Sequence, residues 1–532
     1  MTPSMVKEPS LLIRNATLND VPAISKMIEK TYAGIPDWPA WPLKALKSHI
    51  KIFPEGQFVA LFDGKIVAYS ASILISGDIA LKPHTWDEIS AHGFGTTHDP
   101  QGDYLYGIET CVDPDYWDYH IGQRIYDLRK EFCVRWHLKG IIAGGRLPRL
   151  AAEIKQGKSP EQYINMVQQE KIMDHTLAFQ LRNGFEVIGV LKNYLPEDAE
   201  SSGFATHLIW RNPEIADQDE TPKSKGQIYA HRPNHHYLDV DHARVATVQY
   251  EQRKINSFEE FSAQVEYFIR VVAEYHTDFV LFPESFTMQL LSIENKALSP
   301  DKAILKLSTY TERFKEMMVD FALKYNINII GGSTATQVDD HIQNISYIFL
   351  RDGSVHAQAK IHPTPDERRI WRMQGASRVD KIMTDCGPIG VLICYDSEFP
   401  ELTRHLVDQG MLILFVPFCT DQRMGYLRVR YCAQARAIEN QCYVVMAGNV
   451  GNLPGVHNMN VQYSQSCILT PCDFPFARDG IAADTTPNVE TIAFADLNIK
   501  TLIAGRNTGS VINLKDRRDD LYSIQWHEPG SK

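Results

Sequence analysis

Three residues with complementary chemistry, Glu284, Lys360 and Cys394, each follow an apolar stretch in the second half of the sequence. A cysteine thiolate is a strong nucleophile toward an acyl carbon, but the thiol must first lose its proton. A carboxylate in a partly dry pocket can accept that proton and later give it to a leaving amine. A lysine ammonium can stabilise the negative oxygen of the tetrahedral intermediate. Together these residue types predict acyl transfer from an amide-like substrate.

Each of the three residues also has an ordinary structural explanation. A cysteine at the end of a buried strand is usually a small core residue, and a glutamate after a proline is usually a solvated turn residue. A lysine at a strand end usually protects a sheet edge. The nine cysteines of the sequence show no spacing typical of metal ligands and indicate free thiols in a reducing cytoplasm. The prediction therefore depends on the surrounding elements and motifs.

Alternating apolar strands and amphipathic helices position the three residues. Strands are predicted over 244–249, 278–282, 327–331, 342–351, 387–393, 411–416 and 442–447, and helices over 257–275, 308–325, 401–409 and 427–440. This alternation predicts an α/β core whose sheet is largely covered by helices. Because ligand sites in such sheets lie beyond the carboxyl ends of strands, we expect the three residues to meet in one crevice.

The sequence around these residues resembles the carbon–nitrogen hydrolase (nitrilase) superfamily. The resemblance covers residues 243 to 522 and is carried, in chain order, by Phe282-Pro283-Glu284, Gly331-Gly332-Ser333, Lys360-Ile361-His362-Pro363, Cys394-Tyr395-Asp396-Ser397-Glu398-Phe399-Pro400-Glu401, Arg436-Ala437-Ile438-Glu439-Asn440, Asn449 with Gly451, and Arg517-Arg518-Asp519-Asp520-Leu521-Tyr522. It implies a four-layer α-β-β-α sandwich in which Glu284 is the base, Lys360 the charge stabiliser and Cys394 the nucleophile. It also implies that Glu367 positions the lysine and the substrate, with an exposed surface charge as the alternative. It further implies a homo-oligomer and no cofactor for this domain.

The residues after Cys394 indicate which reaction to expect. The run Cys-Tyr-Asp-x-x-Phe-Pro-Glu resembles the amidase branches of the superfamily, whereas true nitrilases usually carry Trp-Glu or Gly-Glu there. The resemblance implies a hydrolase that cleaves a small linear amide to an acid and ammonia or an amine through a thioester. Two alternatives stay open: an acyltransferase that passes the acyl group to an amine, and a non-catalytic scaffold with a relic domain. Arg368, Arg369 and Arg404 are candidates for contact with an acidic substrate or for surface pairing.

The first half of the sequence carries a different pattern. Strands are predicted over 11–15, 57–62, 65–70 and 104–112, and helices over 21–32 and from 121 to about 137. The order resembles a GCN5-related N-acetyltransferase (GNAT) domain, through Ile13-Arg14-x-Ala16-Thr17-x-x-Asp20, Val112-x-Pro114 and Asn183-Gly184-Phe185-Glu186. The resemblance implies an α+β domain that binds acetyl-CoA through backbone N–H groups at a helix N-terminus, and it carries this role onto Val112, Ile121, Gly122 and Gln123.

The loop before that helix departs from the family's pattern. Residues 117–122 read Trp-Asp-Tyr-His-Ile-Gly where the family usually has Arg/Gln-x-x-Gly-x-Gly. Asp118 adds a negative charge near a diphosphate, and His120 places a side chain where backbone must approach phosphate. Phe179 and Gln180 stand where the family's tyrosine, which protonates the leaving thiolate, is expected. A structural or substrate-selecting domain is therefore the alternative to an acyl-CoA-binding one.

The whole chain resembles the GNAT–nitrilase fusion proteins. Its 532 residues predict more than one domain, and a polar segment with Pro and Gly predicts a division into residues 1–213, a linker at 214–235 and residues 236–532. The net charge of −11 argues against nucleic acid or an anionic membrane as a partner. No apolar run approaches the ~20 residues of a membrane-spanning helix, and the N-terminus lacks the apolar stretch of a secretory signal. The sequence thus predicts a cytoplasmic protein that acts on a small molecule.

Overall fold

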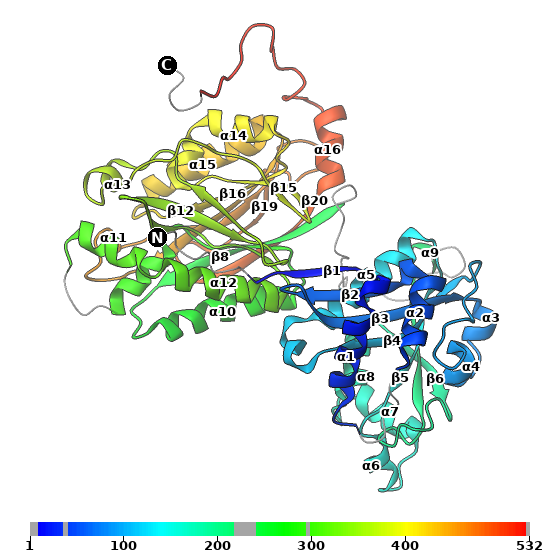
Figure 1. Ribbon diagram of the computed structural model, residues 1–532. Helices are drawn as coiled ribbons and strands as arrows, with labels where there is room; N and C mark the ends of the chain where they lie inside the picture. The colour runs from blue at the N-terminus through cyan, green and yellow to red at the C-terminus, as the bar shows by residue number, and fades with distance from the viewer. Residues whose placement is uncertain (1–8, 36–40, 217–240, 294–297, 528–532) are drawn as a thin grey trace. The chain divides into compact units, whose positions relative to one another are not determined.

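The computed structural model describes residues 9–35, 41–216, 241–293 and 298–527. Contacts divide these residues into two compact units, one within 10–234 and the other made of Pro9 and residues within 235–532 (Figure 1). Most of the linker predicted at 214–235 lies outside the described residues, and its first three residues belong to the short helix α9 (Pro213–Ala216). Each unit has its own cores and is described by itself below.

The N-terminal unit is built on a mixed sheet. Its described strands are β1 (Leu11–Asn15), β2 (Gln57–Phe62), β3 (Lys65–Ile75), β4 (Tyr104–Val112), β5 (Gly140–Arg146), β6 (Glu186–Leu191) and β7 (Ala205–Arg211). They are hydrogen-bonded in the order β1-β2-β3-β4-β5-β7-β6. Among these strands β4 and β5 run parallel, and the other neighbours are antiparallel.

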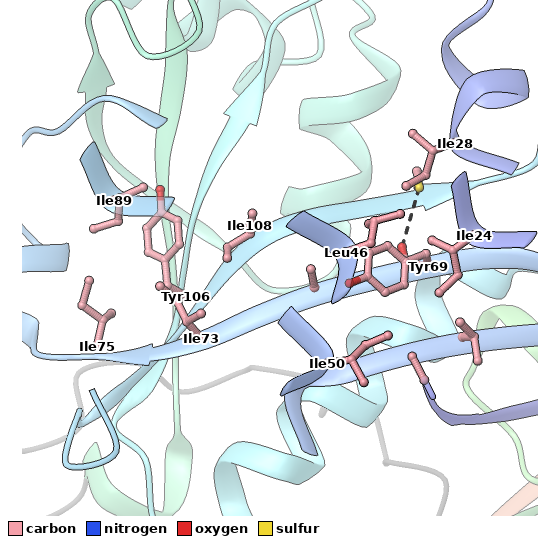
Figure 2. Close-up of a cluster of buried hydrophobic side chains, with 14 of the residues drawn as sticks. Ile24, Ile28, Leu46, Ile50, Tyr69, Ile73, Ile75, Ile89, Tyr106 and Ile108 are labelled. Carbon is pink, nitrogen blue, oxygen red and sulfur yellow. Dashed lines mark hydrogen bonds between the residues drawn. The ribbon is translucent and has the colours of Figure 1, made fainter. Parts of the chain in front are cut away.

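Helices cover both faces of this sheet. Those described are α1 (Val21–Tyr32), α2 (Leu43–Ile52), α3 (Gly77–Ala80), α4 (Trp86–Ser90), α5 (Ile121–Arg135), α6 (Leu150–Ile154), α7 (Pro160–Gln168) and α8 (His175–Arg182). One core joins α1 and α2 to the sheet, with Ile24, Leu46 and Ile73 among its members (Figure 2). A second core, with Tyr163 and Leu177, joins α7 and α8 to the other face. The predicted α+β architecture is confirmed.

The C-terminal unit contains two sheets that share strand β8. The described strands are β8 (His242–Gln252), β9 (Phe279–Leu281), β10 (Asn328–Ile330), β11 (Thr334–Val338), β12 (His341–Phe349), β13 (Val355–Ala359), β14 (Ile382–Thr384), β15 (Gly387–Val391), β16 (Ile413–Phe418), β17 (Tyr443–Gly451), β18 (Cys467–Leu469), β19 (Ile481–Asp484) and β20 (Thr491–Asn498). The body of β8 pairs with β9 and β20, whereas its last residues pair with β17. Strand β8 therefore connects the sheet that contains β9 to the sheet that contains β17.

Alternating side chains explain how the two sheets pack. Along β16, Ile413 and Phe415 enter a core that also contains Val245 and Phe279 of the other sheet. Leu414 between them belongs to a separate core on the opposite face, as the two-residue period of a strand requires. That second core is covered by helices. The inner faces of the two sheets therefore pack on each other.

Helices form the outer layers of this sandwich, whereas Ile499 and Leu502 of the last helix belong to the core between the sheets. Those described are α10 (Phe258–Glu274), α11 (Pro300–Ser308), α12 (Thr311–Tyr325), α13 (Pro365–Arg369), α14 (Pro400–Asp408), α15 (Arg423–Glu439) and α16 (Ile499–Thr508). Figure 1 shows α10 and α12 along one side of the sheets and α14 and α15 along the other. The four-layer α-β-β-α fold is confirmed. No helix within the described ranges has the length and apolar character needed to cross a membrane.

Candidate active site

The candidate nucleophile Cys394 lies in a strained turn just after strand β15. Its φ of 48° falls in the left-handed region, which residues other than glycine adopt at a cost. The turn is a 3-10 helix over Cys394–Glu398, and the Ser397 hydroxyl donates to the Cys394 carbonyl oxygen at 2.7 Å. A nucleophile on a sharp strand-to-helix turn is presented beyond the end of its sheet.

The three charged candidates meet around one ammonium group. The Nζ of Lys360, which follows β13, lies 2.8 Å from Glu284 Oε1 and 2.8 Å from Glu367 Oε2. All three side chains are buried. Glu284 comes from the segment after β9, and Glu367 comes from α13. The structure therefore brings together residues from separate segments of the chain, and the cavity that they line also contains Cys394.

Glu367 reaches the lysine because of how helix α13 begins. The sequence Thr364-Pro365-Asp366-Glu367 forms a capping box in which Glu367 N–H donates to Thr364 Oγ1 at 3.3 Å. In return, the Thr364 N–H donates to Glu367 Oε2 at 2.6 Å. That same oxygen accepts a hydrogen bond from Lys360. The cap thus fixes the glutamate side chain toward the interior, and the alternative of an exposed charge is wrong for this residue.

The buried charges of Glu284, Lys360 and Glu367 shift one another's pKa values. Burial by itself would lower the pKa of Lys360, but the neighbouring Glu284 and Glu367 carboxylates outweigh burial and raise it well above the usual range. Burial raises the pKa of Glu284, only partly offset by the Lys360 ammonium. Burial also acts on Glu367, but Lys360 and the hydrogen bonds from Thr364 and Asn344 outweigh it and lower its pKa. Glu284 is therefore the better proton acceptor of the two glutamates.

The thiol of Cys394 is protonated at rest in this environment. Burial raises its pKa well above the usual range, the negative charge of Glu284 raises it further, and Lys360 opposes both effects. A hydrogen bond from the Cys394 side chain lowers the pKa of Glu284, and the thiol also lies 4.0 Å from the Cys419 carbonyl oxygen. The thiol would have to lose its proton to become a nucleophile, and Glu284 is the candidate base that lines the same cavity.

Asp396 ties the nucleophile turn to the lysine segment. Its carboxylate accepts hydrogen bonds from the backbone N–H groups of Ile361 at 2.9 Å and His362 at 2.8 Å. The ring Nδ1 of His362 lies 2.9 Å from the same carboxylate. Arg436 supports the turn from the other side, because its guanidinium donates to the Ser397 carbonyl oxygen at 3.0 Å. These contacts fix the separation of Cys394 and Lys360.

Hydrogen bonds also fix the position of the segment that carries Glu284. The Asn449 side chain donates to the Glu284 carbonyl oxygen at 2.7 Å, and the Ser285 N–H donates to the Ser333 carbonyl oxygen at 3.0 Å. Gly332 has a φ of 59°, and a Cβ at this position would lie 2.0 Å from the Pro283 carbonyl oxygen. A side chain at position 332 would therefore displace the glutamate segment.

Sequence reasoning missed two further polar groups at this site. Asn344, in the middle of β12, donates to Glu284 Oε1 at 3.0 Å and to Glu367 Oε1 at 2.8 Å. Cys419, just after β16, lines the same cavity, and its thiol donates to Gln462 Oε1 at 3.1 Å. The available signal for Asn344 was a residue type that is depleted in strands, standing inside a predicted strand. Cys419 had no comparable signal among nine cysteines.

The cavity above these residues has a volume of about 390 Å³, enough for a small molecule. Trp371 and Tyr395 contribute aromatic surface to it. Within the described residues, Arg368 and Arg369 do not line this cavity, and Arg404 donates to the Glu439 carbonyl oxygen at 3.1 Å. The three arginines therefore give no support for an acidic substrate. Across the described part of the chain, no cluster of His, Cys, Asp or Glu side chains could hold a metal ion.

The N-terminal unit places its four predicted residues at the junction of β4 and α5. Val112 ends β4, and Ile121, Gly122 and Gln123 form the first turn of α5. A Cβ on Gly122 would lie 3.3 Å from the Phe179 ring and 3.9 Å from Val112, so the turn packs closely on the strand. His120 adopts the left-handed conformation at the helix start, with φ 52°. This histidine thus takes the backbone geometry for which glycine is usually chosen.

A buried cation lies where β4 separates from β5. The two strands pair only from Leu105 to Gly107 on the β4 side. The guanidinium of Arg129, on α5, packs against Gly107: its Nη2 lies 2.2 Å from the position that a Cβ at residue 107 would occupy. Its Nη1 donates to Thr110 Oγ1 at 3.2 Å. Its Nε and Nη2 have no hydrogen-bond partner among the described residues. The first turn of the 15-residue helix α5, two turns before Arg129, presents backbone N–H groups of the kind that bind anions.

A cysteine, two glutamates and a lysine thus line one cavity of an α-β-β-α sandwich, Glu367 from helix α13 and the other three from segments that follow strands. Residues 244–507 match the carbon–nitrogen hydrolase family. The chain is 43% identical over 519 residues to the "Probable hydrolase YhcX" of Bacillus subtilis (strain 168), which covers 98% of each chain. The chain therefore belongs to the carbon–nitrogen hydrolase family.

The N-terminal region has a relative of its own. Over 212 residues it is 32% identical to the "Uncharacterized N-acetyltransferase YkwB" of Bacillus subtilis (strain 168), covering 39% of this chain and 91% of the relative. Among solved structures, Nit3 of Saccharomyces cerevisiae, a member of branch 10 of the nitrilase superfamily, aligns with a TM-score of 0.44 and 22% identity. That alignment covers 53% of this chain and 100% of the yeast chain. The acetyltransferase-like and hydrolase regions thus follow one another in a single chain.

Proposed function

We propose that this protein is an amidase that hydrolyses a small linear amide to an acid and ammonia or an amine through a thioester. The observation that carries the proposal is the Lys360 ammonium, held at 2.8 Å from two buried carboxylates beside the Cys394 thiol. Such an arrangement supplies a nucleophile, a base and a fixed positive charge in one cavity. The yeast relative "Omega-amidase NIT3", 29% identical over 219 residues, supports the choice of amide chemistry.

The proposed reaction has two halves that use the same groups. Glu284 takes the proton of Cys394 as the sulfur attacks the carbonyl carbon, and Lys360 stabilises the resulting oxyanion. Glu284 then gives the proton to the nitrogen, the carbon–nitrogen bond breaks, and ammonia or an amine leaves the thioester. In the second half Glu284 removes a proton from water, the hydroxide attacks the thioester, and the carbon–sulfur bond breaks. The proton returns to the thiolate as the carboxylic acid departs.

Ammonia release from short amides tests the proposed reaction. Purified full-length protein should release ammonia from at least one of acetamide, propionamide and butyramide. The corresponding nitriles should react at least about 100-fold more slowly, because the proton shuttle of the site suits a leaving nitrogen. Added hydroxylamine should give a hydroxamate from the same amide, since it intercepts a thioester. Faster turnover of the nitrile, or ammonia release that survives in Cys394→Ala, would contradict the proposal.

We also propose that the N-terminal unit binds the diphosphate of an acyl-CoA. The backbone N–H groups of Ile121, Gly122 and Gln123 would hold it at the start of α5, and Arg129 would add positive charge where β4 and β5 separate. Bound acyl-CoA would supply an activated acyl group. The relation to YkwB over 91% of that protein supports this assignment.

Titration calorimetry with acetyl-CoA and with CoA tests this second proposal. Both should bind the full-length chain, since the diphosphate is common to them. Gln123→Pro should weaken binding by about tenfold, because proline removes one N–H from the first helical turn, where the helix tolerates it. Gln123→Ala is the matched control and should bind as the unchanged protein does. Equal affinities of the two variants, or no binding at millimolar CoA, would rule the proposal out.

A further inference from the structure

Besides the Lys360 ammonium, Asn344 is the one side chain that contacts both buried glutamates, among the residues whose contacts are described. Its Nδ2 donates one hydrogen to Glu284 Oε1 at 3.0 Å and the other to Glu367 Oε1 at 2.8 Å. Its backbone carbonyl oxygen accepts the N–H of Lys360 at 2.9 Å. This residue therefore touches all three charged members of the site, twice through its side chain and once through its main chain.

The orientation of the Asn344 amide follows from its surroundings. If the amide were flipped, its oxygen would face two carboxylate oxygens, and both hydrogen bonds would become repulsive contacts. The observed orientation leaves Oδ1 buried without a partner among the described residues. A buried acceptor left unsatisfied is a cost, and a strand that only needed to be filled would carry an apolar residue here. The two hydrogen bonds that the amide nitrogen donates to the glutamates therefore explain why asparagine stands at this position.

The two buried glutamates carry more negative charge than the single Lys360 ammonium can neutralise, so a further hydrogen-bond donor stabilises them. Two carboxylates share a single ammonium, and each also repels the other through the buried space between them. Lys360 is the cation that forms an ion pair with Glu284, and Glu367, Cys394 and Cys419 are the other titratable groups whose charges act on it or respond to it. Asp366, Glu398, Asp421 and Arg428 also line the cavity. A neutral donor to both carboxylates favours their charged forms without adding a charge that would compete with Lys360.

We propose that Asn344 is a positioning residue that keeps Glu284 and Glu367 ionised on either side of Lys360. This inference rests on the proposed role of Glu284 as the base for Cys394. Without the amide, the two carboxylates would hold a proton to a higher pH, and Glu284 could not accept the thiol proton at neutral pH. The amide thus sets the pH at which the nucleophile becomes available.

The pH dependence of Cys394 alkylation tests this inference without any substrate. The exposed Cys472 is first replaced by serine in every variant, since it would also react. Iodoacetamide alkylation of Cys394 is then followed by mass spectrometry between pH 5 and 9. In Asn344→Leu the profile should move to higher pH by about one unit, which lowers the rate at neutral pH about tenfold. In Asn344→Asp, which has nearly the same shape, the shift should be at least as large because a third carboxyl joins the site.

A buried asparagine from the neighbouring strand β10 gives a matched control. Asn328 is fully buried and donates to Asp385 Oδ1 at 2.9 Å, away from the catalytic cavity. Asn328→Leu should lower thermal stability and leave the pH profile in place. If Asn344→Leu and Asn344→Asp also lose only stability, Asn344 is structural and the inference is overturned. If Cys394 of the unchanged protein shows no preferential alkylation, the proposed function itself is contradicted. That result differs from one in which Cys394 is alkylated preferentially but the Asn344 variants do not shift the pH profile.

Discussion

Replacing Cys394 with alanine should abolish amide hydrolysis while leaving the fold intact. The sulfur of Cys394 would form the thioester, and its removal leaves the turn over Cys394–Glu398 without a nucleophile. Loss of a nucleophile that works together with a base and a charge stabiliser lowers kcat by about 10⁴-fold or more. The hydrogen bonds that fix the turn run through Asp396, Ser397 and Arg436, and none of them involves the thiol.

The measurement for Cys394→Ala combines turnover with trapping. Rapid quenching of the unchanged protein with its best amide should give a covalent adduct on the Cys394 peptide, and the variant should give none. Cys419→Ala is the matched control, because Cys419 lines the same cavity and has a buried thiol whose pKa burial raises to about 12. Its adduct should stay on Cys394. An adduct found on Cys419 in the unchanged protein would reassign the nucleophile.

Much of the fold was predictable from the sequence because buried parallel strands and amphipathic helices leave clear patterns. The predicted helix over 257–275 is α10 (Phe258–Glu274), and the predicted strand over 387–393 contains β15 (Gly387–Val391). The short antiparallel strands β18 (Cys467–Leu469) and β19 (Ile481–Asp484) were not predicted. Three or four residues give too little periodicity, and their pairing depends on partners distant in the sequence.

Site residues that directly follow a strand could be predicted from the sequence. Site residues whose role depends on contacts between distant segments could be predicted less well. Glu284, Lys360 and Cys394 could be proposed because each stands after an apolar run within a family motif. Glu367 was placed only loosely, although the capping box starting at Thr364 was a local signal that fixes its side chain. The contacts of Asn344 could not be predicted, since they join β12 to two segments far apart in the chain.

Replacing Lys360 with methionine should have the largest effect on stability as well as on activity. Lys360 is fully buried and offsets two buried carboxylates, so its removal leaves Glu284 and Glu367 facing each other without a cation. Breaking a buried ion pair from one side costs about 3–5 kcal/mol. Activity should also fall to background, because the oxyanion would lose its positive charge. Lys315→Met is the matched control, since Lys315 pairs with Glu312 on the surface and should cost about 0–1 kcal/mol.

The loss in Lys360→Met should depend on pH in a definite direction. Without the ammonium, both glutamates should have folded-state pKa values above the value of about 4.3 in the unfolded chain. A carboxyl with a raised folded-state pKa binds more protons in the folded state, so stability falls as pH rises through that range. The variant should therefore recover part of its deficit as the pH is lowered from 7 toward about 5, as measured by urea unfolding of both proteins. A deficit independent of pH would mean that lost packing, not unbalanced charge, destabilises the variant, and Lys360 would not be the counter-ion of the two glutamates.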